Sequence, residues 1–164
     1  YNTRRKECET GLAALRQQFS ITSFREATLD MLDTVADSIS SNVYNRCKYV
    51  VEEIARMEAA CNHLLAGEID AFGARMYETH MGLSELYEVS CAELDCIVQN
   101  CKKENDIVGA RMMGGGFGGC VIALVQTANV EVVYNRINTA YQNTFGRTMG
   151  KYLMQIGDGT RLLN

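Results

Sequence analysis

Proline is absent from this sequence of 164 residues, and long apolar runs and a surplus of basic residues are missing as well. Because nothing proline-based marks a linker, and no repeat or low-complexity stretch occurs, we predict a single domain spanning residues 1–164. Every apolar run is far shorter than the ~20 residues needed to cross a bilayer, which argues against a membrane protein. The net charge of −4 leaves no basic surplus to neutralise phosphates, which argues against nucleic-acid binding.

Metal-binding patterns are also scarce. The sequence has no Cys-x-x-Cys pair, and its two histidines are His63 and His80. Cys61 and His63 lie two positions apart, so their side chains would diverge on a helix. The seven cysteines, an odd number scattered within helical patterns, do not resemble a disulfide framework. We therefore expect no metal site and interpret the cysteines as small buried hydrophobic residues, with a zinc site as the alternative.

The composition is that of a folded globular protein. Hydrophobic residues make up 47% of the chain and charged residues 22%, a balance typical of soluble domains with a packed core. Because the chain has no signal-like start, the sequence favours a cytoplasmic location. The first residue is Tyr1 rather than Met, which leads us to expect a fragment of a longer protein.

Apolar residues recur at helical steps of three and four through the first two thirds of the chain. The pattern predicts five helices, around residues 8–19, 29–32, 47–65, 72–88 and 94–101. Two capping boxes, Ser23 with Glu26 and Ser90 with Glu93, are predicted to open the second and the fifth of these helices. Gly67 is predicted to end the long third helix in the left-handed conformation.

The pattern changes near residue 107. Residues 107–112 and 120–125 predict two short strands. A helix capped by Asn129 and ended by Gly146 follows, and residues 152–156 predict a last strand. This order predicts an α+β fold, with helices packed on a small, mostly antiparallel sheet.

Between the two strands the sequence has a loop of five glycines and one phenylalanine: Gly114, Gly115, Gly116, Phe117, Gly118 and Gly119. Ordered glycines cost backbone entropy, so a protein keeps so many only where positive φ or close approach requires them. Consecutive exposed N–H groups can bind a phosphate or a developing negative charge. No Gly-Lys-Ser/Thr follows, as a P-loop requires, and the next element is a strand rather than the helix of a dinucleotide fingerprint. The residues alone leave open a ligand loop and a hairpin tip without a ligand.

Five segments, in order along essentially the whole chain, resemble the galactokinase family of the GHMP kinase superfamily. Residues 109–125, GARMMGGGFGGCVIALV, are similar to the third motif of that superfamily in its galactokinase form. Residues 71–95 resemble a helical segment in which a Ser/Thr-His pair precedes Tyr-Glu-Val-Ser-Cys. Residues 1–9 resemble the tyrosine-plus-arginines opening of the C-terminal half. Residues 45–67 resemble an Arg-rich entry into a long helix, and residues 155–163 resemble the closing strand.

The resemblance implies a GHMP kinase C-terminal domain, and an enzyme that phosphorylates the anomeric hydroxyl of galactose to galactose 1-phosphate with ATP and Mg. It implies that the glycine loop lies in the cleft, near the nucleotide phosphates and the sugar. Tyr1 matches the family tyrosine that hydrogen-bonds a sugar hydroxyl; without the resemblance it would be interpreted as a frayed terminal residue. Phosphoryl transfer depends on positioning and electrostatic stabilisation, to which a preorganised backbone contributes.

Two positions depart from the family pattern. The family usually has a small hydroxyl residue where Met113 stands, so Met113 removes a hydrogen-bonding group beside the loop. The family usually has a proline where Ala92 stands, so Ala92 costs some stiffness at a helix start. We interpret Arg111 as a structural residue that pairs with an acid, with a position facing the cleft as the alternative. We interpret His80 as a hydrogen-bonded core histidine rather than a catalytic base.

The family's nucleotide-binding loop, its Arg-Asp sugar motif and its catalytic aspartate do not occur in this sequence. We expect them in an N-terminal ATP-binding domain that is absent from the chain, and we expect that domain to bind most of the ATP and Mg. We therefore predict no catalytic residue here, no kinase activity for the chain alone, and self-association through the face that would meet the missing half. The alternatives are another GHMP sugar kinase and a non-catalytic galactokinase-like sensor or interaction module.

Overall fold

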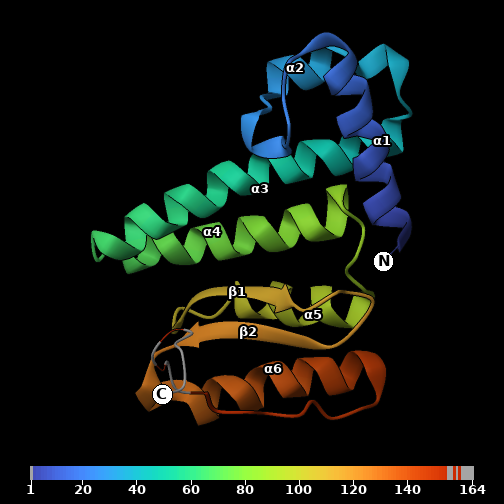
Figure 1. The fold of residues 1–164 in the computed structure, drawn as a ribbon. Helices are drawn as coiled ribbons and strands as arrows, with labels where there is room; N and C mark the ends of the chain where they lie inside the picture. The colour runs from blue at the N-terminus through green and yellow to red at the C-terminus, as the bar shows by residue number, and fades with distance from the viewer. Residues whose placement is uncertain (1, 155–156, 158, 160–164) are drawn as a thin grey trace, which may run out of the picture.

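The structure, a computed structural model, describes residues 2–154, 157 and 159. Its elements in chain order are α1 (Asn2–Gln18), the 3-10 turn η1 (Phe24–Glu26), α2 (Leu29–Thr34), the 3-10 turn η2 (Ala36–Ser38), α3 (Ser41–Leu65), α4 (Ile69–Met81), the π-helical turn η3 (Gly82–Leu86), α5 (Ala92–Cys101), β1 (Ile107–Met113), β2 (Cys120–Val125), the 3-10 turn η4 (Thr127–Asn129) and α6 (Val130–Phe145). Figure 1 shows α1 and α2 at one end, the α3–α4 hairpin in the middle, and the sheet with α5 and α6 at the other end. The predicted α+β class is confirmed.

The helices at the N-terminal end share one small core. A Cβ on Gly11 would lie 3.3 Å from the Cγ1 of Val43 and would collide with the sulfur of Cys47, so the glycine lets α1 approach α3 closely. Thr28 caps α2 by accepting a hydrogen bond from the Met31 amide at 3.2 Å. The buried residues of this core are Leu15, Leu32, Val35, Val43 and Cys47.

The sheet consists, within the described residues, of β1 and β2 paired antiparallel with Arg111 opposite Ile122. One face packs on α5 and α6, and the core there consists of Val98, Cys101, Ile107, Ala110, Val133 and Ile137. Helix α4 closes the edge of β1, because a Cβ on Gly109 would lie 2.5 Å from the Cα of Gly73. This contact fixes the strand that leads into the glycine loop.

Most predicted elements are confirmed, and three details are corrected. Gly67 and Gly146 end α3 and α6 with φ of +74° and +67°, as expected. The predicted last strand is wrong for residues 152–154, which have no regular secondary structure, and residues 155 and 156 lie outside the described residues. Neither Ser23 nor Ser90 caps a helix with its side chain. Glu26 accepts hydrogen bonds from the Thr22 amide at 3.3 Å and from the Ser23 hydroxyl at 3.4 Å, and Ser90 donates to Asp95.

The prediction that the cysteines are buried is only partly correct. Cys47 and Cys101 are buried, but Cys61 and Cys120 are exposed. In the part of the chain that the structure describes, no group of three or more His, Cys, Asp and Glu side chains is arranged to hold a metal ion. None of the described helices has the length and apolarity needed to span a bilayer.

Candidate functional site

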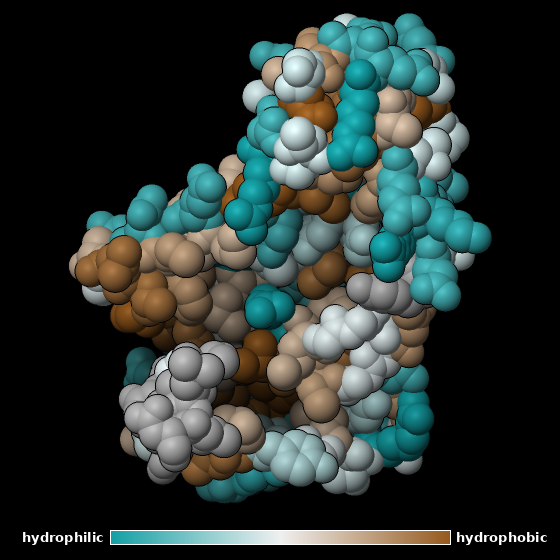
Figure 2. All heavy atoms as spheres, in the orientation of Figure 1, coloured by the Kyte–Doolittle hydropathy of each residue, from teal (hydrophilic) through white to brown (hydrophobic). Residues whose placement is uncertain are grey.

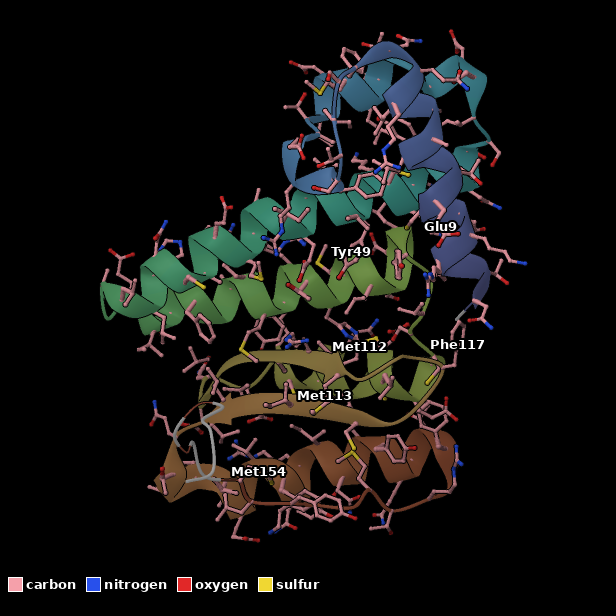
Figure 3. All side chains as sticks on the ribbon, viewed as in Figure 1. Glu9, Tyr49, Met112, Met113, Phe117 and Met154 are labelled. Carbon is pink, nitrogen blue, oxygen red and sulfur yellow. The ribbon has the colours of Figure 1, made fainter. Side chains whose placement is uncertain are left out.

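The glycine loop forms the tip of the β1–β2 hairpin. Gly114, Gly116, Gly118 and Gly119 have φ of +89°, +86°, +131° and +101°, a range that residues with a Cβ rarely adopt. Phe117, the one residue of the loop with a side chain, also has a positive φ of +60°, and the residue is 58% exposed. In Figure 3 it lies at the far end of the hairpin, on the side where α1 begins. The conformation of the loop therefore favours glycine at four of its five glycine positions.

Most amides of the loop are free to bind another group. The Phe117 N–H donates to the Val89 carbonyl at 2.7 Å. Among the described residues, the N–H groups of Gly114, Gly115 and Gly116 donate no hydrogen bond to the protein. Unpaired amides at a turn attract anions, and the loop has no titratable side chain. The loop can therefore bind a negatively charged group, and its own residues supply no acid or base.

The loop rests on the segment between η3 and α5. A Cβ on Gly116 would lie 2.7 Å from the Cβ of Val89 and would collide with the Val89 carbonyl oxygen. Val89 is 3% exposed and packs with the buried Leu94 and Met112. The loop is thus attached to the hydrophobic core at Val89.

The residue before Val89 is unusual. Glu88 has a φ of +51°, although it is not a glycine. Its carboxylate accepts from the guanidinium groups of Arg46 at 2.5 Å and Arg4 at 3.3 Å. Arg46 is 1% exposed and also donates to the carboxylate of Glu7 at 3.3 Å. Four charged side chains from α1, α3 and the segment after η3 therefore meet next to the residue that anchors the loop.

His80 is a hydrogen-bonded core histidine, as predicted. It is 5% exposed, and its Nδ1 accepts the Met112 N–H at 3.2 Å. Because a backbone amide can only donate, the proton of the neutral ring lies on Nε2, which is 3.2 Å from Asp95 Oδ1. Burial lowers the pKa of His80, and the nearby Asp95 carboxylate opposes this effect in part. The Asp95 carboxylate also accepts from Ser84 and Ser90, so this cluster fixes α4, α5 and β1 relative to one another.

The second face of the sheet is partly exposed among the described residues. It carries Arg111 and Met113 from β1 and Ile122 from β2, and Met113 and Ile122 are 47% and 40% exposed. Arg111 donates to the Met112 carbonyl at 3.2 Å, and within the described residues it forms no ion pair with an acid. The predicted acid partner of Arg111 is therefore not found there. The first residue of α5 is Ala92, a position where a proline would fit without loss of a hydrogen bond.

The predicted site residues are brought together only in part. The six loop residues lie together at the hairpin tip, whereas Tyr1 lies outside the described residues. Sequence reasoning missed Arg46 and Glu88. A signal for Arg46 existed, because it follows Val43 by three positions and therefore shares the apolar face of its helix. Glu88 carried no comparable signal, since its left-handed conformation depends on partners 42 and 84 positions away.

Comparison with known proteins shows the family. The model of the GHMP kinases C-terminal family matches residues 57–143, so the chain belongs to the GHMP kinases. A galactokinase of Clostridium perfringens is 37% identical over 97% of the chain, and the human galactokinase is 37% identical over 99% of it. The chain spans only 41% and 40% of these two relatives.

The fold agrees with this assignment. A crystal structure of Lactococcus lactis galactokinase complexed with galactose superimposes with a TM-score of 0.92 at 32% identity. The match covers 97% of this chain and 41% of that one. The expected type of domain, a GHMP kinase C-terminal domain with helices on a small antiparallel sheet, is confirmed.

Proposed function

We propose that this chain is the C-terminal portion of a galactokinase, which transfers a phosphoryl group from ATP to the anomeric hydroxyl of galactose and forms galactose 1-phosphate. The names of the relatives support this function, because galactokinases match nearly the whole chain at 37% identity. The chain corresponds to about two fifths of their length, so the proposal includes an N-terminal ATP-binding domain that supplies the catalytic residues. Residues 1–164 are then one domain of that kinase.

The observation that carries the proposal is the row of unpaired amides in the glycine loop. Gly114, Gly115 and Gly116 present N–H groups without a partner among the described residues, and they lie where the sequence resembles the third kinase motif. Such amides fit phosphate oxygens, because they are fixed before the reaction and have no side chains in the way. ATP, bound with Mg, supplies the phosphoryl group. The role of the loop is to bind and orient negative charge near the reacting groups.

The remaining part of the sugar site is assigned to Tyr1. By its resemblance to the family tyrosine, its phenol hydroxyl would bind a galactose hydroxyl and orient the sugar. Asn2 begins α1, and Arg4 in that helix contacts the carbonyl of Glu88 at 3.2 Å, one residue before the anchor of the loop. This contact supports a site in which sugar and phosphate groups are bound close together.

The exposed apolar surface supports an interface with the remainder of the kinase. Figure 2 shows apolar side chains at the free end of the α3–α4 hairpin and in the hollow beneath it. The exposed residues of the hairpin end include Met57, Leu64, Leu65 and Ile69. Exposed patches of this kind mark interaction surfaces. The other half of the kinase would cover them, and we expect the isolated chain to self-associate through them.

The test is ATP-dependent phosphorylation of sugars by this chain and by the longer protein that contains it. We expect galactose phosphorylation by the longer protein only. The Gly116→Ala variant should lower kcat at least tenfold, because its Cβ collides with Val89. Gly150→Ala is the control, since Gly150 is exposed and its Cβ would come no closer than 3.4 Å to the Tyr152 ring. Phosphorylation of a different sugar would reject galactose as the substrate. Galactose binding without turnover in the longer protein would reject the enzyme.

A further inference from the structure

Two arginines from separate helices converge on Glu88. Arg46 of α3 donates to the Glu88 carboxylate at 2.5 Å and to the Leu86 carbonyl. Arg4 of α1 donates to the Glu88 carbonyl oxygen at 3.2 Å and to its carboxylate at 3.3 Å. Glu7 accepts from both arginines, at 3.0 Å from Arg4 and 3.3 Å from Arg46. We call these four residues, Arg4, Glu7, Arg46 and Glu88, the arginine clamp.

Three of the four side chains of the clamp lie largely inside the fold, whereas the side chain of Glu88 is 51% exposed. The side chain of Arg46 is 1% exposed, and those of Arg4 and Glu7 are 16% and 17% exposed. A buried guanidinium group persists only where charges and hydrogen bonds satisfy its donors. The two carboxylates and the Leu86 carbonyl supply these acceptors for Arg46, so the position of Glu88 is defined by a buried cation.

The clamp holds a residue in a conformation that it would not adopt alone. Glu88 has a φ of +51°, which brings the Cβ of an L-residue close to its own backbone. Such conformations persist where the surroundings over-determine them, and they concentrate at functional sites. Both the carbonyl oxygen and the carboxylate of Glu88 are hydrogen-bonded to arginines. The side chain and the backbone of this residue are therefore fixed together.

The next residue transmits this geometry to the glycine loop. The conformation of Glu88 sets the direction of the chain at Val89, whose carbonyl accepts the Phe117 N–H at 2.7 Å. Within the described residues, no other amide of the loop donates a hydrogen bond to the protein. Gly116 packs against the same peptide group of Val89. The route from the clamp to the loop is thus two residues of backbone and one hydrogen bond.

We propose that the arginine clamp is a positioning device for the glycine loop. It keeps Glu88 in the left-handed conformation, so that Val89 holds Phe117 and the free amides of Gly114 to Gly116 keep one orientation. Through Arg4 it also fixes the loop relative to α1, the helix that follows Tyr1 in sequence. The link between clamp and loop stands on these contacts, whereas its role in phosphoryl transfer rests on the proposed function.

The first experiment measures amide hydrogen exchange by NMR and does not depend on activity. In Glu88→Ala, exchange at Phe117 should accelerate at least tenfold, while the amides of α6 keep their rates. In Glu88→Gly the acceleration should be smaller, because glycine adopts positive φ without the Cβ penalty. Glu9→Ala is the matched control. Glu9 lies in α1, as Arg4 and Glu7 do, and its exposed carboxylate pairs with Arg5 at 2.9 Å. Its removal should leave the exchange rate of the Phe117 amide unchanged.

Three results would overturn the proposal. Unchanged exchange at Phe117 in Glu88→Ala would show that the clamp does not hold the loop. Equal acceleration throughout α6 would show that the clamp acts on the whole fold instead. Equal rates at Phe117 in Glu88→Ala and Glu88→Gly would show that the left-handed conformation is not what the clamp maintains.

The second experiment uses the longer kinase and variants whose near-ultraviolet circular dichroism shows a fully folded protein. Glu88→Ala should lower kcat at least tenfold and change the KM for ATP less than threefold, because a misplaced loop loses contacts made to charge that develops in the transition state. Glu88→Gly should recover part of kcat, and Glu9→Ala should retain it. A rise in the KM for ATP without a fall in kcat would overturn the positioning role. If the wild-type kinase does not phosphorylate galactose while the exchange result holds, the proposed function fails and the link between clamp and loop stands.

Discussion

Replacement of Gly73 by alanine tests whether the contact between α4 and β1 governs the stability of this half of the molecule. Two effects of opposite sign act at this position. Alanine is favoured over glycine in a helix by about 1 kcal/mol. The new Cβ, however, would lie 2.5 Å from the carbonyl carbon of Val108 and 2.6 Å from its Cγ1. Overpacking of this kind costs about 1–3 kcal/mol, and the upper end applies because a backbone group cannot rotate away.

The net expectation for Gly73→Ala is a loss of about 2 kcal/mol in the free energy of unfolding. For a chain of this length, that loss lowers Tm by about 4–8 °C. Thermal and urea denaturation, followed by circular dichroism, measure both quantities. Ala74→Gly, at the exposed neighbouring position of the same helix, is the control and should cost about 1 kcal/mol through helix propensity alone. If Gly73→Ala raised Tm, helix propensity would outweigh the contact, and the reasoning would be refuted.

Two further predictions concern the loop and the buried histidine. Gly114→Ala should cost about 1–2 kcal/mol through its φ of +89° alone, because a Cβ there meets nothing within 4 Å. Gly116→Ala should cost more, because it adds the collision with Val89, and equal urea midpoints for the two variants would contradict the contact. Burial lowers the pKa of His80 below its usual value of 6.5. At a pH just below 6.5 the histidine is therefore more fully protonated in the unfolded chain than in the folded chain. Stability should therefore fall as the pH drops below about 6.5. Urea midpoints at pH 7.5 and 5.5 should differ less in His80→Asn, which cannot titrate, and an identical pH dependence would count against this account.

The helices and the β-hairpin could be predicted from the sequence, because their signals are local. Apolar residues at steps of three and four gave α3 and α4, and Gly67 and Gly146 marked the ends of α3 and α6 correctly. The glycine loop was equally visible as a loop, because five glycines in six positions favour positive φ, although the residues alone left its ligand open. The long helix was interpreted less well. The apolar pattern that predicts this helix runs to Leu65, but Leu65 is 88% exposed, because no partner in the described chain covers that end of α3.

The details that organise the site depend on contacts between distant residues, which a local pattern does not reveal. Gly73 and Gly109 are unremarkable in sequence, yet each is required by a close contact: the backbone of Val108 lies against Gly73, and the backbone of Gly73 lies against Gly109. The predicted caps do not form, because the two serine hydroxyls donate to carboxylates and accept no hydrogen bond from a helix amide. Ser90 bonds the carboxylate of Asp95, and the helix then begins at Ala92 without a side-chain cap. The arginine clamp likewise joins residues from three segments of the chain.

The contacts of helix α4 limit which changes in this chain can be tolerated. Gly73 fixes one point of the helix against β1, and Gly82 fixes the other end, because a Cβ there would lie 2.7 Å from the Tyr49 ring. The two glycines are nine positions apart, which a helix spans in about 14 Å. One inserted residue would lengthen this segment by about 1.5 Å and rotate everything after it by about 100°. Between Gly73 and Val89 the molecule therefore depends on length more than on composition: exposed side chains there can vary, whereas a single insertion or deletion would move the anchor of the glycine loop.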